Sequence, residues 1–94
     1  IYLTPNPVEY MSDIVISHDR PLAPLDVDIY IYDLSGRIIG RDNYSVVSDN
    51  SGMIKINWFL KPSMSDGLYY VKAIISDING KKSSKSTKIF VRKQ

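Results

Sequence analysis

The 94-residue chain contains no cysteine and only one histidine, and Glu9 is its only glutamate. The absence of cysteine excludes disulfide bridges, zinc–thiolate sites and a cysteine nucleophile. A single His and a single Glu leave little material for acid–base catalysis. The 5 glycines are isolated from one another, so no phosphate-binding glycine loop is present. No hydrophobic run approaches the ~18 residues of a transmembrane helix.

The composition is that of one small folded domain. Hydrophobic residues make up 44% of the chain and charged residues 23%, which is too apolar for a disordered tail. We therefore expect a single domain over residues 1–94. Because Ile1 is not a natural start, we also expect the chain to be a fragment of a larger protein, cut at a domain boundary; the resemblance described below implies that it is the C-terminal fragment.

The two halves of the chain differ in charge although the net charge is only +2. Residues 1–50 are mainly acidic and residues 51–94 mainly basic. The last part of the chain carries a cluster of cations: Lys81, Lys82, Lys85, Lys88, Arg92 and Lys93. Such a basic strand either meets an anionic partner or uses its lysines to protect a sheet edge.

Alternation of apolar and polar residues predicts β-strands throughout. It is clearest at residues 25–34, where one face holds Leu25, Val27, Ile29 and Ile31. The same period predicts strands at residues 12–18, 53–59, 68–76 and 84–92. No segment shows a sustained helical period.

Turn residues separate these runs. Ser35-Gly36 predicts a hairpin that returns through Arg37-Ile38-Ile39, and Asn79-Gly80 predicts a type I′ turn. The pattern indicates an all-β fold, namely a two-sheet antiparallel immunoglobulin or fibronectin-III-like sandwich of about seven strands. Trp58 should fill its core. Tyr69 should form a tyrosine corner, in which its hydroxyl bonds to upstream backbone.

The polar residues suggest no reaction centre, and we predict no catalytic, cofactor-binding or metal-binding residue. His18 and Asp19 are neighbours, but adjacent strand residues face opposite sides, so Asp19 should not orient His18. Residues 77–80 resemble the start of a calcium loop, but no glutamate follows. Asp26 and Asp28 share a strand face without a third carboxylate.

Tyr30, Tyr32 and Tyr70 should form an aromatic outer face. Such tyrosines could stack on nucleic-acid bases, but Asp26 and Asp28 on the same strand would repel phosphate. They could stack on sugars, which predicts a carbohydrate-binding or spacer sandwich of a secreted enzyme as the alternative function. They could also pack against upstream domains of the same chain.

Short motifs occur in a familiar order along the chain. Pro5-Asn6-Pro7 precedes the first long strand, and Gly36 follows a serine. Gly67 stands two residues before Tyr69, and Lys88 directly precedes a final triplet of apolar residues. This order resembles the C-terminal immunoglobulin-like domains of the type IX (Por) secretion system of Bacteroidetes. The stretch from residues 17 to 27 most resembles that system's PorU-type sortases, which are gingipain-type cysteine peptidases.

The resemblance implies a noncatalytic secretion-signal and cell-surface anchoring domain. The catalytic residues of a PorU-like parent would lie upstream, and the domain would dock on a PorV-like outer-membrane β-barrel on the extracellular side. Pro5, Asn6, Pro7, Gly36, Gly67, Tyr69 and Lys88 would be the targeting or docking positions. The basic strand at residues 84–92 could recruit the partner by strand addition.

Overall fold

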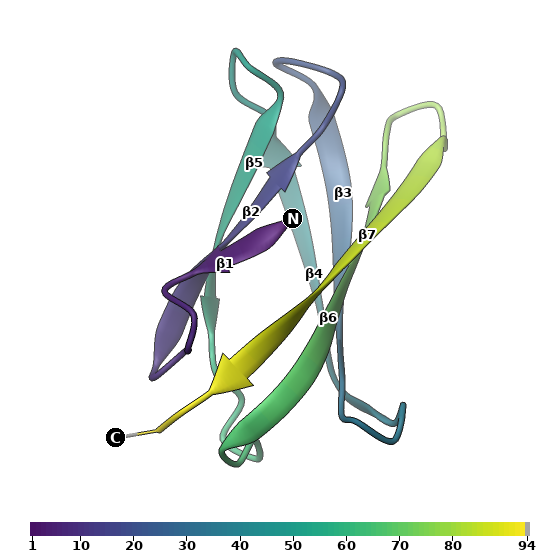
Figure 1. Cartoon of the computed structure of the whole chain (residues 1–94). Helices are drawn as coiled ribbons and strands as arrows, with labels where there is room; N and C mark the ends of the chain where they lie inside the picture. Colours follow the sequence, from purple (N-terminus) through teal and green to yellow (C-terminus); the bar gives the residue numbers. More distant parts are fainter. Residues whose placement is uncertain (94) are drawn as a thin grey trace.

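The computed structural model describes residues 1–93, which form seven strands in two antiparallel sheets (Figure 1). The strands are β1 (Tyr2–Thr4), β2 (Met11–Ser17), β3 (Pro24–Tyr32), β4 (Ile38–Val47), β5 (Met53–Phe59), β6 (Gly67–Ser76) and β7 (Lys82–Val91). One sheet has the order β1-β2-β5 and the other β4-β3-β6-β7. The predicted sandwich is therefore confirmed, and β7 lies at a sheet edge.

Alternation places one face of each central strand in the core. In β3, Val27, Ile29 and Ile31 are each 0% exposed, while the aspartates and tyrosines between them face outward. β5 behaves in the same way, and Trp58 is only 1% exposed, as predicted. Apolar residues outside the strands also seal the core, notably Val8 and Met64.

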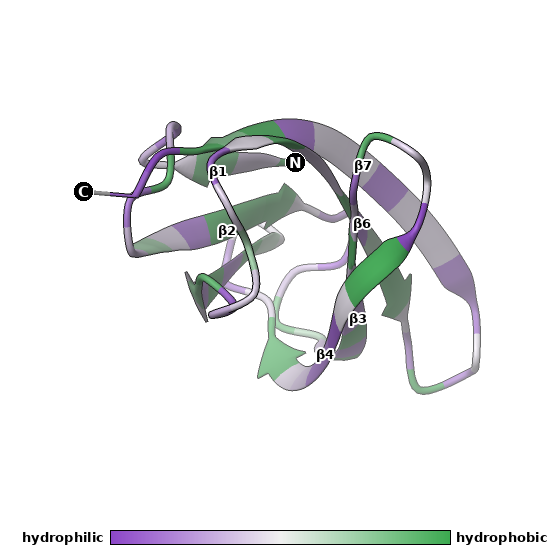
Figure 2. Cartoon of the chain, turned by 90° about the horizontal axis from the view of Figure 1, so that it is seen from below, coloured by the Kyte–Doolittle hydropathy of each residue, from purple (hydrophilic) through white to green (hydrophobic). Residues whose placement is uncertain are grey.

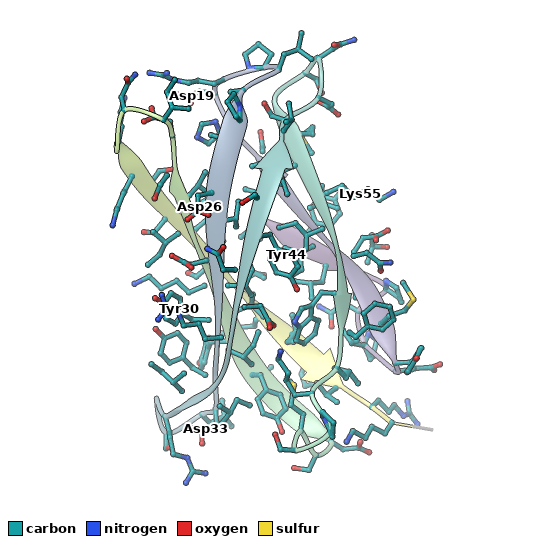
Figure 3. The ribbon with its side chains drawn as sticks, turned by 180° about the vertical axis from the view of Figure 1, so that it is seen from behind. Asp19, Asp26, Tyr30, Asp33, Tyr44 and Lys55 are labelled. Atoms are coloured by element: carbon teal, nitrogen blue, oxygen red, sulfur yellow. The ribbon has the colours of Figure 1, made fainter. Side chains whose placement is uncertain are left out.

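Two strands were missed or shortened by the sequence pattern. β1 has three residues, and only Leu3 points into the core, so the sequence contains no alternating run that would indicate this strand. β4 continues to Val47, well beyond the predicted return at residues 37–39. Its inward positions are only half-buried because it is an edge strand, and they include Gly40 and Asp42. Tyr44, an inward residue of β4 labelled in Figure 3, packs against the core, and its burial, helped by the charge of Asp42, raises its pKa.

Three turns share one bonding pattern, built on an aspartate with a glycine three residues later. Two of them close hairpins, whereas the turn at residues 49–53 joins β4 of one sheet to β5 of the other. In the turn after β6, Asp77 accepts a hydrogen bond from the backbone N–H of Gly80 and donates its own N–H to Lys81. Its carboxylate also accepts from the N–H groups of Asn79 and Lys81, each at 2.9 Å. Residues 33–37 and 49–53 repeat this pattern. Gly80 has a positive φ of 81° and Asn79 does not, so the hairpin is confirmed but the predicted type I′ turn is wrong.

Candidate functional site

The structure brings the seven predicted docking positions to one end of the sandwich. This motif end consists of residues 5–8, the hairpin at residues 33–37, the start of β6 and the last residues of β7. It is the lower end in Figure 1, where the C-terminus also lies. The opposite end carries the loops at residues 18–23, 48–52 and 77–81. Residues that are far apart in the sequence therefore form one surface.

The Pro5-Asn6-Pro7 segment joins the beginning of the chain to its last strand. The Ser12 hydroxyl donates to the carbonyl of Pro5 at 2.9 Å, and the Asn6 side-chain oxygen accepts from the N–H of Phe90 at 3.0 Å. Both X-Pro bonds in this segment are cis. The segment itself is exposed, and the two hydrogen bonds hold it in place, so both prolines lie on the surface in a fixed position.

The next residue extends this contact. Val8 donates its N–H to the carbonyl of Phe90 at 2.7 Å and accepts from the N–H of Arg92 at 2.9 Å. It forms a short parallel bridge with Val91. The outer edge of β7 is therefore covered at residues 90–92 by the chain's own N-terminal segment. The part of residues 84–92 that is free for strand addition is correspondingly shorter than predicted.

Tyr69 forms the predicted tyrosine corner. Its hydroxyl donates to the carbonyl of Ser65 at 2.7 Å, and the side chain is buried. Gly67 begins the strand with a φ of 148°, which L side chains rarely adopt. The carboxylate of Asp66 accepts from the N–H of Lys93 at 2.8 Å. Gly67 and Tyr69 thus fix the chain at the motif end, and Tyr69 itself is not available to a partner.

Gly36 closes the hairpin of residues 33–37. The hydroxyl of Ser35 and the backbone N–H of Arg37 both bond to the carboxylate of Asp33 and hold its pKa below the ordinary 3.8. The Arg37 guanidinium lies 3.2 Å from the same carboxylate. The role of Gly36 is therefore to complete a rigid turn.

Lys88 presents an exposed cation beside apolar surface. Its ammonium lies 5.8 Å from the centre of the Tyr70 ring on the neighbouring strand, a cation–π arrangement. Phe90, two residues further, is 56% exposed although it is large and apolar. We call Pro5, Asn6, Pro7, Lys88 and Phe90 the docking surface. The hydrogen bond between Asn6 and Phe90 ties its two parts together.

The outer face of β3 is less suited to sugar stacking than its sequence suggests. The rings of Tyr30 and Tyr32 stack on each other with centres 6.3 Å apart. The guanidinium of Arg41 lies 5.2 Å from the centre of the Tyr30 ring. Tyr30 therefore already has neighbours against its ring, on the outer face seen in Figure 3. Asp26 and Asp28 share the amide of Asn43, at 3.2 Å and 2.9 Å.

His18 lies just beyond the end of β2, so the prediction that it belongs to the strand of residues 12–18 is wrong. Its Nδ1 atom therefore comes within 3.4 Å of the Asp19 carboxylate, which strand geometry was expected to prevent. The same Nδ1 accepts the N–H of Arg20 at 3.2 Å. Because Nδ1 accepts this N–H, it has no hydrogen to donate to Asp19, and the 80% exposed Asp19 side chain forms no enclosed catalytic pair with His18. In the described part of the chain, no three His, Asp or Glu side chains are grouped to hold a metal ion.

The turn at residues 49–53, which joins the two sheets, was missed in the sequence although its signal is present. Asp49-Asn50-Ser51-Gly52 has the same Asp-x-Ser-Gly spacing as residues 33–36. The Ser51 hydroxyl, then the N–H of Met53, bonds to the Asp49 carboxylate and lowers its pKa. A comparison of the two segments would have predicted this turn.

The two sheets and the tied motif end define a small immunoglobulin-like domain whose exposed features suit recognition of a partner. The chain belongs to the family of secretion system C-terminal sorting domains, whose model matches residues 1–92. Its role is accordingly sorting by the type IX secretion machinery and not catalysis, and the protein is secreted or displayed at the cell surface. No curated protein matches the chain.

A solved structure adds detail to this assignment. The chain is similar to part of dimeric latent PorU from Porphyromonas gingivalis, with 28% identity and a TM-score of 0.79. The match covers 99% of this chain and 9% of the PorU chain. The predicted resemblance to the PorU-type domain is thereby confirmed. Among residues 1–93, no helix is long and apolar enough to cross a membrane.

Proposed function

We propose that this chain is the C-terminal domain of a PorU-like cysteine peptidase and anchors its parent on the extracellular side of the outer membrane. The catalytic residues would then lie in a preceding part of the parent. Similarity to PorU along nearly the whole chain supports this parentage. The domain would be a single unit of residues 1–94 that is retained with its peptidase.

The docking surface is the proposed contact with a PorV-like outer-membrane β-barrel. The observation that carries this assignment is the convergence of the seven motif positions at one end, where the Asn6 side chain joins the first loop to the last strand. A surface assembled from both ends of the chain exists only when the domain is folded. A partner that binds it would therefore select a completely synthesised and folded protein.

Point substitutions test this proposal better than truncation does. Deleting residues 85–94 would remove Ile89 and Val91, which are 0% and 3% exposed, and would destroy the core. We expect Lys88→Glu combined with Phe90→Ser to abolish display of a fused fluorescent reporter on the surface of cells that carry the secretion system. Both side chains face outward, so the domain should remain folded.

Lys55→Glu is the control, since Lys55 is an exposed lysine on β5 in the other sheet. It should leave display unchanged. Normal display of the double variant, with folding verified by circular dichroism, would refute the docking surface. Recovery of the PorV-like barrel with the wild-type domain, and not with the double variant, would support the partner assignment.

A further inference from the structure

The last strand is divided into a covered part and an open part. At its C-terminal end, the N–H groups of Phe90 and Arg92 point away from β6 and bond to Asn6 and Val8. N–H groups alternate in direction along a strand, so those of Ser84, Ser86 and Lys88 point the same way. No strand within residues 1–93 pairs with that side of β7 over residues 82–88. The result is an open edge of unpaired backbone donors and acceptors.

The open edge is positively charged on both faces. Lys82 and Lys88 lie on the outer face of the sheet and Lys85 on the opposite face, because their positions alternate. Their neighbours on β6 are Ser76, Tyr70 and Ala73, none of which is acidic. In the described chain, Lys82 and Lys85 form no ion pair. Their charges are therefore available to another molecule.

The inner face beside this edge is also polar and accessible. Ser83 is exposed, and Lys85 and Thr87 are only half-buried, whereas Ile89 and Val91 further along are buried. The opposing sheet ends in β1, which has three residues and does not cover this part of β7. The loop after β2 reaches this side at His18 and Asp19, which line a solvent-open hollow together with Ser83 and Lys85. Figure 2 shows hydrophilic and pale bands along most of β7, with hydrophobic colour near its C-terminal end. An added strand would therefore keep both of its faces in contact with water.

We propose that residues 82–88 accept an extended acidic segment of a protein partner as a fifth strand of the sheet. The inference rests on the proposed function and specifies the chemistry of the partner. Unpaired backbone groups supply the hydrogen bonds, and carboxylates opposite Lys82, Lys85 and Lys88 supply charge complementarity. A second copy of the same edge would bring lysines against lysines, so the lysines also select against self-association.

The test uses the 94-residue chain labelled with nitrogen-15 and an acetylated peptide of four Glu-Thr repeats. We expect slower amide hydrogen exchange at Ser84, Ser86 and Lys88 when the peptide is added. The amides of Lys85 and Thr87, which face β6, should change little. A peptide with lysine in place of glutamate should not produce this protection.

Two variants separate strand addition from simple charge attraction. Ser84→Pro removes an outward N–H without changing charge, and proline is tolerated at such edge positions. We expect it to weaken peptide binding roughly tenfold. Lys82→Glu with Lys85→Glu should weaken binding at least as much, about tenfold or more, while Lys55→Glu should not.

The alternative occupant is an anionic membrane surface, tested with phosphatidylglycerol vesicles. The inference would be overturned if the peptide did not protect the three amides while the chain bound the vesicles equally well with and without the Ser84→Pro substitution. Equal peptide affinity for Ser84→Pro and wild type would also overturn it. These readouts are independent of reporter display: loss of display in the Lys88→Glu, Phe90→Ser variant together with no peptide binding would refute the acidic strand and retain the sorting role.

Discussion

The two ends of the sandwich carry the same five-residue turn in different surroundings: at one end it closes the hairpin of β3 and β4, and at the other it joins β4 to β5 of the other sheet. Residues 33–37 at the motif end and residues 49–53 at the opposite end show identical backbone and carboxylate hydrogen bonds. Gly36 and Gly52 have nearly the same positive φ, 87° and 83°. A Cβ atom on Gly36 would meet nothing within 4 Å, but on Gly52 it would lie 2.2 Å from the carbonyl oxygen of His18.

The difference shows that neighbours in space, more than the turn itself, determine how much a turn residue matters. His18 donates its N–H to Gly52 at 2.9 Å, and Leu22 donates to Asp49 at 3.1 Å, so two loops are joined at the opposite end. The motif end is instead joined through the two ends of the chain, by the bond between Asn6 and Phe90. Gly36 was predicted as a motif position, yet Gly52 is the more tightly enclosed residue.

The largest expected effect removes the core on which both ends rest. Trp58→Ala should cost about 3–5 kcal/mol, because a buried aromatic ring is lost and a cavity remains. Domains of this kind have a total stability of about 5–15 kcal/mol, so the variant could unfold. Urea denaturation measures the loss. Phe59→Ala is the control, since the adjacent Phe59 points outward and is 49% exposed. A loss below about 1 kcal/mol for Trp58→Ala would contradict the packing.

The two turns should differ strongly in their response to the same substitution. Gly36→Ala should cost about 1–2 kcal/mol, the penalty of an L residue at positive φ. Gly52→Ala should cost about 2–5 kcal/mol, because the backbone of residue 18 must also move. Urea denaturation of the two variants side by side gives the comparison. Equal losses would show that the contact with His18 is not constraining.

The tyrosine corner allows a smaller test of the motif end. Tyr69→Phe removes the donor to the Ser65 carbonyl and should cost about 1–2 kcal/mol. Tyr70→Phe is matched in chemistry, but the Tyr70 hydroxyl has no hydrogen-bond partner in the described chain, so its change should stay within about 0.5 kcal/mol. Thermal unfolding of the two variants should therefore give clearly different midpoints. Similar midpoints would indicate that the corner does not stabilise the domain.

The smallest expected effect is a loss of stability at acidic pH, to which both turns should contribute alike. The pKa values of Asp33 and Asp49 lie below the ordinary 3.8, because a serine hydroxyl and backbone N–H groups favour their ionised forms. The unfolded chain therefore binds protons first as the pH falls. The stabilisation is complete above 3.8 and is lost as the pH falls through the folded-state pKa values.

Urea denaturation at a series of pH values measures this loss. Asp33→Asn and Asp49→Asn should each flatten the acid dependence of the free energy of unfolding, and to a similar extent. Asp19→Asn is the control, because Asp19 is 80% exposed and accepts no such set of N–H groups. An unchanged acid dependence in both the Asp33 and the Asp49 variant would show that these carboxylates do not contribute to stability.

Much of the fold could be predicted where one sheet face is fully buried. In β3 and β6 the inward positions are uniformly apolar, so the period of two is visible directly. β4 was predicted only in part. Its inward positions include Gly40 and Asp42, and as an edge strand it pairs with β3 alone, so its inward face is not uniformly apolar. The Asn79-Gly80 turn was given the wrong type because Asp77 captures the backbone N–H groups and changes the turn.

The docking positions were predicted as residues but not as a surface. Nothing local in the Pro5-Asn6-Pro7 segment shows that Asn6 bonds to Phe90 or that the next residues cover the edge of β7. The basic strand was identified in the sequence, but its division into a covered and an open part depends on that contact. The position of Lys88 beside Tyr70 likewise required the pairing of β6 with β7.

By itself, the sequence determined the all-β class, the central strands and the buried tryptophan, because alternation and turn residues act over a few neighbouring positions. It also indicated the family of the domain, through the order of short motifs along the chain. Only the tertiary structure decided which glycine is enclosed, which part of β7 remains open and how the motif residues meet. Those properties depend on contacts such as the one between Asn6 and Phe90, 84 positions apart, whose partners are set by sheet order and packing.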